Sequence, residues 1–316
     1  MALVPDPHNI RLGIAGKVDE NDHPYSWSAI LNGYDPAAMR QFAAPVISEY
    51  LTAQPVGNFG IPGVRVTHIW CDDAREAKRI MSASRIDAMV DGPEQLIGNV
   101  DAVLIPTDRG EEHVRRARPF VEAGLPVFVD KPLCDNLEDL RVFEQWVSDG
   151  GAILSCSALR FALEFEAMRE RLGEVGQMRL ISVAMAKSWR RYGIHALEAV
   201  YPFLEPGGWI SATNSGRSGA EIVAYEHRSG VQLVVMVGED CFGGFGCLNV
   251  YGTKSRLSAK FGDSFSAFKR QLAAFVEYLR TGRPPFPFNQ RRELIHMLIA
   301  GDKSRAEGGR RFTLPL

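Results

Sequence analysis

The amino-acid sequence predicts an α/β fold: a Rossmann-like parallel-sheet domain followed by an α+β domain with a large, open, mostly antiparallel sheet. Through the first 130 residues, apolar strand-like runs alternate with amphipathic helical patterns, which is typical of a parallel sheet covered by helices on both faces. Later strand-like runs follow one another without crossover helices between them, which favours antiparallel pairing. The length of 316 residues fits two ordinary domains. We therefore expect one domain over 1–130 and a second over 131–316.

Three mostly apolar runs, at residues 10–15, 100–105 and 126–129, and a β-branched run at 64–71 predict the strands of the parallel sheet. Helical patterns lie between them. Asp35 and Pro36 begin one helix, because an Asp side chain caps free backbone N–H groups and proline fits the first helical position. Apolar spacing extends this helix to Leu51. Two more helices are predicted at residues 74–83 and 114–124.

The second domain combines helices with a series of strands. Asn136 caps a predicted helix that ends near Gly150, and a late amphipathic helix over 265–279 ends at Gly282. Apolar, β-branched segments predict four strands, at residues 179–186, 221–227, 231–237 and 248–252. These strands are expected to form the open sheet.

The composition favours a soluble, cytoplasmic protein and excludes several functional classes. The net charge is −2 and no long basic run occurs, which argues against nucleic acid or an anionic membrane as a partner. The N-terminus lacks the segments of a signal peptide, and no apolar stretch approaches the roughly 18 residues of a membrane span. The five cysteines include no C-x-x-C pair, so we expect neither a disulfide framework nor a metal site.

The turn after the first strand is where a Rossmann domain binds a dinucleotide, through the pattern G-x-G-x-x-G. Here the residues are Gly16-Lys17-Val18-Asp19-Glu20-Asn21, so only the first glycine is present. Val18 stands where close approach of the backbone to a pyrophosphate normally requires glycine. Gly16 and Lys17 are the candidates for this site, with a pyrophosphate grip that differs from the usual one.

Asp72 ends the second strand and is the candidate for the acid that binds the adenosine ribose. An acid at this position repels a 2′-phosphate, which favours NAD over NADP, although Arg75 nearby keeps NADP open. The alternative is that Asp72 caps the helix beginning at Ala74. Both interpretations are retained, since one residue can serve both roles.

The G-x-G-x-x-G pattern is the dinucleotide fingerprint of a Rossmann unit. Residues 17–60 form a longer segment than the one that follows this fingerprint in a compact unit. One interpretation is a loop that lines the ligand crevice, with His23, Tyr25 and Trp27 facing a ligand. The other is an insertion whose aromatic side chains pack on the domain.

Further motifs occur along the chain in a characteristic order. They are Pro106-Thr107 after an apolar strand, His113 six residues later, Asp130-Lys131-Pro132, Leu159-Arg160-Phe161 and Gly193-Ile194-His195. Together they resemble the glucose–fructose oxidoreductase / inositol dehydrogenase / MocA (Gfo/Idh/MocA) family. Its members typically show Thr-Pro, His, Glu-Lys-Pro, Arg-Phe and Gly-x-His in this order. The resemblance runs from about residue 10 to the C-terminus.

This resemblance implies an NAD-dependent oxidoreductase, with NADP as the alternative cofactor, that transfers hydride to or from a sugar, sugar acid or inositol-like polyol. It implies that Lys131 stabilises alkoxide charge and that His195 takes the hydroxyl proton at neutral pH. It further implies a set of binding residues, namely Pro106, Thr107, His113 and Asp130 near the cofactor and Arg160 and Tyr192 at the substrate. For His113 a purely structural role is the alternative.

The resemblance also implies a division of roles between the domains. Residues 1–130 would bind the dinucleotide, and residues 131–316 would bind the substrate and form oligomer contacts. The expected assembly is a homo-oligomer of two or four chains.

Two positions depart from the family pattern. Arg191 stands four residues before His195, where the family often has Asp. Glu198 stands three residues after His195, where the family often has another Asp. A cation near an imidazole disfavours its protonated form. We therefore expect Arg191 either to bind a substrate carboxylate, with Glu198 or another acid partnering His195, or to point to solvent. The first option predicts a sugar acid or another anionic polyol as substrate.

These departures keep two other functions open. One is a non-redox sugar- or nucleotide-binding homologue with a degenerate cofactor site. The other is a lyase or epimerase that uses bound NAD transiently.

Overall fold

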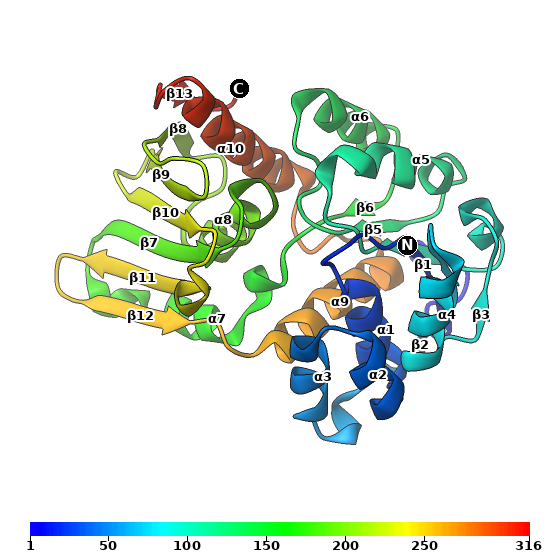
Figure 1. The fold of residues 1–316 in the computed structure, drawn as a ribbon. Helices are drawn as coiled ribbons and strands as arrows, with labels where there is room; N and C mark the ends of the chain where they lie inside the picture. Colours follow the sequence, from blue (N-terminus) through cyan, green and yellow to red (C-terminus); the bar gives the residue numbers. More distant parts are fainter. The chain divides into compact units, whose positions relative to one another are not determined.

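A computed structural model describes the whole chain, residues 1–316. The residues form two compact units, each with its own β-sheet (Figure 1). Unit 1 comprises residues 1–130, 141–155 and 268–286, and unit 2 comprises residues 131–140, 156–267 and 287–316. The predicted fold class is confirmed, because unit 1 holds a parallel Rossmann-like sheet and unit 2 holds a mixed, mostly antiparallel sheet.

The sheet of unit 1 has six parallel strands in the order β3-β2-β1-β4-β5-β6. Their bounds are Ile10–Ala15 (β1), Val64–Trp70 (β2), Ala88–Met89 (β3), Ala102–Ile105 (β4), Val127–Val129 (β5) and Ile153–Leu154 (β6). The four predicted strands are confirmed as β1, β2, β4 and β5. The strand order reverses between β1 and β4, and doubly wound sheets bind ligands at such a point, outside the carboxyl ends of the strands.

Helices connect these strands. Their bounds are His23–Asn32 (α1), Pro36–Phe42 (α2), Pro45–Thr52 (α3), Ala74–Ala83 (α4), His113–Glu122 (α5) and Leu137–Ser148 (α6). Short 3₁₀ turns occupy Val56–Asn58 (η1), Pro93–Leu96 (η2) and Gly110–Glu112 (η3). Asn136 Oδ1 accepts a hydrogen bond from Asp139 N at 2.8 Å, which confirms the predicted cap of α6.

The segment between β1 and β2 is mostly helical rather than a loop. Asp35 caps α2 as predicted, since its Oδ1 accepts a hydrogen bond from Ala38 N at 2.8 Å. The single helix expected to reach Leu51 is wrong, because α2 ends before Pro45 and that proline begins α3. Tyr25 and Trp27 are completely buried, which supports the packing interpretation for these two side chains.

The sheet of unit 2 has seven strands in the order β12-β11-β7-β10-β9-β8-β13. Their bounds are Met178–Ala186 (β7), Trp209–Asn214 (β8), Ala220–His227 (β9), Gln232–Gly238 (β10), Cys247–Gly252 (β11), Arg256–Lys260 (β12) and Phe312–Thr313 (β13). The pair β7 and β10 is parallel and every other pair is antiparallel. The four predicted strands are confirmed as β7, β9, β10 and β11.

Helices accompany this sheet, and one face of the sheet stays partly open. The helices are Leu163–Glu170 (α7), Ile194–Val200 (α8) and Phe288–Ala306 (α10), whereas Ser264–Thr281 (α9) begins in unit 2 and lies mostly in unit 1. The short turns are Ala158–Phe161 (η4), Leu172–Val175 (η5), Trp189–Gly193 (η6), Tyr201–Phe203 (η7) and Phe242–Gly244 (η8). Val223 and Val235 are buried on neighbouring strands, whereas Ile222 and Met236 are 47% and 39% exposed.

Helix α10 was not predicted from the sequence. Its residues are buried without a break from Leu294 to Gly301, so no polar face marks a helical period. No helix in the structure combines the length and the apolar character that a membrane crossing needs. All five cysteines are free.

Candidate active site

A cavity of about 390 Å³ lies in unit 1, beyond the carboxyl ends of β1 and β2. Its lining includes the cationic side chains of Lys17, Arg109 and Arg116 and five carboxylates, among them Asp72 and Glu112. Two predicted cofactor residues, Lys17 and Asp72, therefore line the same cavity. Charged side chains of both signs can bind the hydroxyl groups and the phosphates of a dinucleotide.

Gly16 meets the geometric demand of the first fingerprint glycine. Its φ is +99°, in the region that favours glycine. A Cβ atom added there would lie 2.7 Å from Nη1 of Arg116 and 3.3 Å from Cγ2 of Thr107. The tight turn therefore requires glycine, and the residues present fit a dinucleotide at this end of β1.

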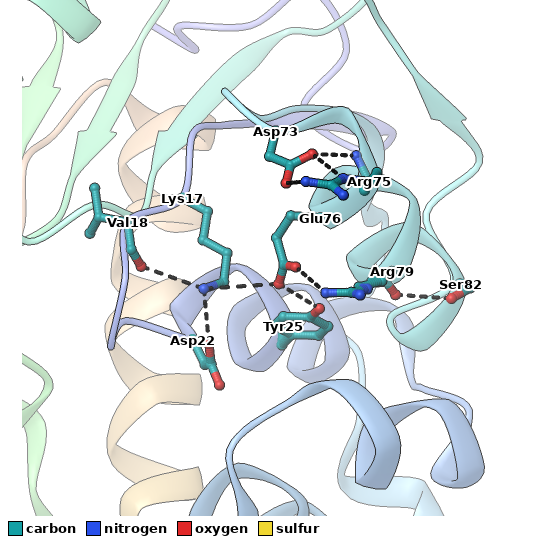
Figure 2. A network of polar contacts seen from close by, with 9 residues as sticks. All are labelled: Lys17, Val18, Asp22, Tyr25, Asp73, Arg75, Glu76, Arg79 and Ser82. Carbon is teal, nitrogen blue, oxygen red and sulfur yellow. Dashed lines mark hydrogen bonds and ion pairs between the residues drawn. The ribbon is translucent and has the colours of Figure 1, made fainter.

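Lys17 belongs to a polar network with Asp22, Glu76 and Tyr25 (Figure 2). Its Nζ lies 3.3 Å from Asp22 Oδ1 and 3.9 Å from Glu76 Oε1. Glu76 also accepts a hydrogen bond from Tyr25 Oη at 2.8 Å. Burial and this hydrogen bond raise the pKa of Tyr25, so its hydroxyl stays a donor. The network holds one positive charge at the cavity between two negative ones.

Asp72 and Asp73 have different roles. Asp73 caps α4, because its Oδ1 accepts a hydrogen bond from Arg75 N at 2.8 Å, and Figure 2 shows the Arg75 guanidinium paired with the same carboxylate. The alternative in which Asp72 caps this helix is therefore wrong. Asp72 instead pairs with Arg116 Nη1 at 3.0 Å and keeps 47% of its side chain exposed. Its carboxylate is available to a ligand in the cavity.

Asp130 follows β5 and is bound by the start of α1. His23 Nδ1 lies 2.6 Å and Asn21 Nδ2 3.2 Å from Asp130 Oδ2. The His23 ring stacks on Trp27, with ring centres 5.0 Å apart. His23 therefore packs on Trp27 and also contacts Asp130, a predicted cofactor residue. Its side chain is 16% exposed.

The loop after β4 is closed by a buried histidine. Pro106 and Thr107 follow β4 and are buried, and His113 Nε2 lies 2.7 Å from the Thr107 carbonyl oxygen. His113 is completely buried. It therefore joins the start of α5 to the loop next to Gly16, which is a structural role beside the cofactor region.

A second cluster surrounds Tyr192 in unit 2. Lys131 Nζ lies 5.1 Å and Lys187 Nζ 4.5 Å from the centre of the Tyr192 ring. The ring of His195 is 5.2 Å from the same centre. The structure therefore brings together three predicted residues, Lys131, Tyr192 and His195, and adds Lys187.

Lys187 fixes the direction of the Tyr192 hydroxyl. Its Nζ donates a hydrogen bond to Tyr192 Oη at 2.6 Å. An ammonium group has donors only, so the phenol oxygen accepts and its own proton points away from Lys187. Lys187 has a φ of +69°, a strained conformation that is often found at functional sites.

Ser157 is a partner of His195 that the sequence did not indicate. Ser157 Oγ lies 2.6 Å from His195 Nδ1 and accepts a hydrogen bond from Leu159 N at 3.1 Å. The backbone N–H of Ser157 donates to Glu198 Oε1 at 3.2 Å. Glu198, expected as a direct partner of the imidazole, thus acts on it through Ser157.

Glu198 is the centre of a buried ion cluster. Its side chain is completely buried and contacts Arg160 Nε at 2.7 Å and Arg291 Nη1. Burial raises the pKa of this carboxyl, but the charges of Arg291 and Arg160 outweigh it and hold the pKa below its ordinary value. Arg160, predicted as a substrate contact, also donates to Gln290 Oε1 at 3.1 Å. Its guanidinium is therefore largely occupied by structural partners.

Arg191 lies in the single-turn π-helix η6, between Trp189 and Gly193, and is partly exposed. Its neighbour Arg190 contacts Asp135 Oδ2 at 3.3 Å. The tight packing of this turn is visible at Gly193, where a Cβ atom would lie 2.7 Å from the Trp189 ring. The glycine of the Gly-x-His motif thus lets α8 begin against Trp189.

Cys71 lines the cavity of unit 1 beside Asp72. Burial, reinforced by the charges of Asp72 and Glu76, raises the pKa of the Cys71 thiol to about 12. The thiol is therefore protonated at neutral pH. The structure has no cluster of three or more His, Cys, Asp or Glu side chains that could hold a metal ion.

Comparison with known proteins supports the fold and matches a family model over part of the chain. Residues 42–156 match the model described as "Oxidoreductase family, NAD-binding Rossmann fold", the Gfo/Idh/MocA family. The predicted resemblance to this family is confirmed. The matched segment of the Gfo/Idh/MocA Rossmann fold includes Asp72, Pro106, Thr107, His113, Asp130 and Lys131.

One curated protein and several solved structures are similar to this chain. The "Putative UDP-kanosamine synthase oxidoreductase subunit" of Amycolatopsis mediterranei (strain S699) is 27% identical over 108 residues, which are 34% of this chain and 27% of that protein. The myo-inositol 2-dehydrogenase of Lactobacillus plantarum has a TM-score of 0.77 at 13% identity, covering 96% of this chain and 99% of that chain. The myo-inositol dehydrogenase of Lactobacillus casei, in complex with NAD(H) and myo-inositol, has a TM-score of 0.75 at 13% identity, covering 98% and 97%. At these identities the structures show the fold alone.

Proposed function

We propose that the protein is an NAD-dependent dehydrogenase that oxidises a CH–OH group of a sugar, sugar acid or inositol-like polyol. The observation that carries this proposal is the cluster of Lys131 and His195 around Tyr192, because alcohol oxidation needs a cation and a base at one oxygen. The family description, an oxidoreductase with an NAD-binding Rossmann fold, supports it. The curated relative is matched over only 27% of its length, so its activity guides the choice of substrates and no more.

The cavity of unit 1 is the proposed cofactor site. Gly16 would allow the tight turn beside the dinucleotide, Lys17 would offer a positive charge, and Asp72 would accept hydrogen bonds from ribose hydroxyl groups. Bound NAD supplies the hydride acceptor of the reaction. Since five carboxylates line this cavity against three cations, we expect the 2′-phosphate of NADP to be disfavoured.

The proposed chemistry of unit 2 rests on Lys131 and His195. The Lys131 ammonium would stabilise negative charge on the carbinol oxygen as its proton leaves. His195 would accept that proton at Nε2. This requires the tautomer in which Nδ1 carries the hydrogen and donates it to Ser157 Oγ. The hydroxyl oxygen has two lone pairs, so it can accept this hydrogen bond together with the one from Leu159 N. Ser157 is thus a positioning residue for the base.

Tyr192 and Arg191 are the proposed substrate contacts. The Tyr192 hydroxyl, directed by Lys187, would donate to a substrate oxygen. Arg191 would bind a carboxylate, which favours a sugar acid or another anionic polyol. Arg160 is proposed only as an indirect contributor, since Glu198 and Gln290 hold it.

We also propose that the protein works in the cytoplasm as a homo-oligomer of two or four chains. The partly open sheet face of unit 2, with Ile222 and Met236 exposed, supports such an assembly. In this proposal residues 1–130 bind the dinucleotide, and residues 131–316 bind the substrate and the neighbouring chains.

A spectrophotometric assay of NAD reduction tests the function. The substrates are myo-inositol, scyllo-inositol, glucose and glucuronate, and the enzymes are the wild type and the Ser157→Ala variant. We expect wild-type turnover with at least one of them and, in Ser157→Ala, an altered pH profile of kcat with little change in KM. Failure of the wild type to bind or reduce NAD would remove the dehydrogenase proposal.

A further inference from the structure

Arg116 lies in the wall of the unit 1 cavity, although no motif of the sequence points to it. It belongs to α5, and only 7% of its side chain is exposed. Its Nε and Nη2 lie 2.8 Å and 2.7 Å from Glu112 Oε2. The third nitrogen, Nη1, lies 3.0 Å from Asp72 Oδ2. Glu112 therefore binds Nε and Nη2 of the guanidinium, while Nη1 points toward Asp72.

The same Nη1 atom lies against the glycine of the fingerprint. A Cβ atom on Gly16 would be 2.7 Å away from it, so the absence of a side chain at Gly16 leaves room for the guanidinium. Arg116 also lines a neighbouring cavity of about 270 Å³, between Trp70, Pro93 and α5. The guanidinium therefore stands between two hollows at the ends of β1 and β2.

The usual phosphate cradle is impaired in this chain. Val18 replaces the glycine that lets the backbone approach a pyrophosphate, and its side chain is buried. Asp22 stands at the N-cap of α1 and holds Lys17 at 3.3 Å. A carboxylate at a helix N-terminus competes with a phosphate for the same partial positive charge. A phosphate in this cavity therefore needs a cation other than Lys17, and the lining offers Arg109 and Arg116. Of these two, Arg116 has a guanidinium nitrogen beside both Gly16 and Asp72.

We propose that Arg116 is the phosphate anchor of the cofactor site and that it binds by exchanging partners with Asp72. This proposal rests on the proposed function. In the adenosine diphosphate part of NAD, the ribose hydroxyl groups are donors and the phosphate attached to the same ribose is an acceptor. Asp72 accepts and Arg116 Nη1 donates, side by side. The ligand can therefore satisfy both members of the ion pair, while Glu112 keeps the guanidinium in place.

The exchange also predicts selectivity for NAD over NADP. In NADP, a 2′-phosphate stands in place of the 2′-hydroxyl group that would donate to Asp72, and two anions would face each other. Asp73, Glu76 and Glu112 line the same cavity, and their carboxylates would repel the 2′-phosphate as well. Arg116, held on one side by Glu112, offers only Nη1 to a phosphate.

Calorimetric titrations with three ligands test this proposal. The ligands are NAD, ADP-ribose and adenosine, and the proteins are the wild type, Arg116→Gln and the control Arg115→Gln. Arg115 lies one residue away on α5, and its side chain is 71% exposed. We expect Arg116→Gln to weaken NAD and ADP-ribose by about 10- to 100-fold, the range for a lost charged hydrogen bond, and adenosine by less than about twofold. Arg115→Gln should change all three by less than about twofold.

The outcomes separate this inference from the function on which it rests. If Arg116→Gln binds ADP-ribose as tightly as the wild type, or loses adenosine equally, Arg116 is not the phosphate anchor. If the wild type binds neither NAD nor ADP-ribose, the proposed function falls and this inference with it. Thermal melting checks folding, and Arg116→Lys, which keeps the charge, should recover part of the lost ADP-ribose affinity even if the Gln variant folds poorly.

Discussion

Two arginine–carboxylate clusters in the protein have the same chemistry and different surroundings. In unit 2, Glu198 is completely buried and binds Arg160 and Arg291. In unit 1, Asp72 is 47% exposed and binds Arg116 beside a cavity. A buried carboxylate between two arginines cannot change partners without leaving charges uncompensated. An exposed one can, so the cluster of unit 1 is suited to a ligand and that of unit 2 to holding structure.

The largest effect is expected when the buried cluster is broken. Glu198→Gln leaves Arg160 and Arg291 without their counter-charge and should lower the free energy of unfolding by about 3–5 kcal/mol. Thermal or urea unfolding measures it. The control is Glu174→Gln, which removes an exposed ion pair with Arg171 and should leave the melting temperature unchanged. Equal melting of the two variants would contradict the structural role of Glu198.

The same variant has a defined pH dependence. The pKa of Glu198 is depressed in the folded protein from its ordinary value of 4.5. Its contribution to stability is therefore fully present above that value and is lost as pH falls through the folded-state pKa. The stability gap between wild type and Glu198→Gln should be widest near neutral pH and should narrow below about pH 4.5.

A smaller effect, on turnover, is expected at the Tyr192 cluster. Lys131→Ala should lower kcat by on the order of 10² because it removes the cation that stabilises alkoxide charge. Thermal melting checks that the variant folds, because the Lys131 side chain is buried. Steady-state kinetics with NAD and the best polyol measures it, with Lys78→Ala, an exposed lysine of α4, as the control. Near-normal turnover in Lys131→Ala would exclude its catalytic role.

Arg191 should have a still smaller and substrate-dependent effect. If it binds a carboxylate, Arg191→Ala should reduce kcat/KM for uronic or aldonic acids by about fivefold, the value of a partly exposed ion pair, and leave neutral sugars unaffected. Arg190→Ala, whose side chain is 63% exposed, is the matched control. An acid preference that survives in Arg191→Ala, or none in the wild type, favours neutral sugars instead.

The smallest response is expected from Cys71. Its pKa of about 12 leaves almost no thiolate, which is the reactive form. Iodoacetamide at about pH 8 should therefore label the exposed Cys241 and spare Cys71, as peptide mass spectrometry would show. Rapid labelling of Cys71 in the folded protein would mean that this part of the cavity wall is open.

Much of the fold follows from local patterns in the sequence, and the exceptions have physical causes. Strands β1, β4 and β5 are runs of mostly apolar residues and β2 is rich in β-branched residues, which a window of sequence detects. Strands β3 and β6 have two residues each, which is too short to show an alternating pattern. Helix α10 is buried from Leu294 to Gly301, so its apolar residues show no helical period. Pro45 divides a continuous apolar pattern into two helices.

The candidate site shows a similar limit. Lys131, Tyr192 and His195 were predicted from motifs, and the fold brings them together. Ser157, Lys187 and Arg116 take their places from contacts between distant segments, such as the one between Ser157 and His195. Arg160 was also predicted from a motif, and the structure pairs it with the buried carboxylate of Glu198 on α8.

A calorimetric titration of the wild type with NAD, NADH, NADP and NADPH tests whether the cavity beside Gly16, Lys17 and Asp72 holds a nicotinamide dinucleotide without 2′-phosphate. We predict that NAD and NADH bind more tightly than NADP and NADPH, and that Asp72→Asn narrows this difference by removing the negative charge that repels the phosphate. Absence of binding by all four dinucleotides would contradict the account.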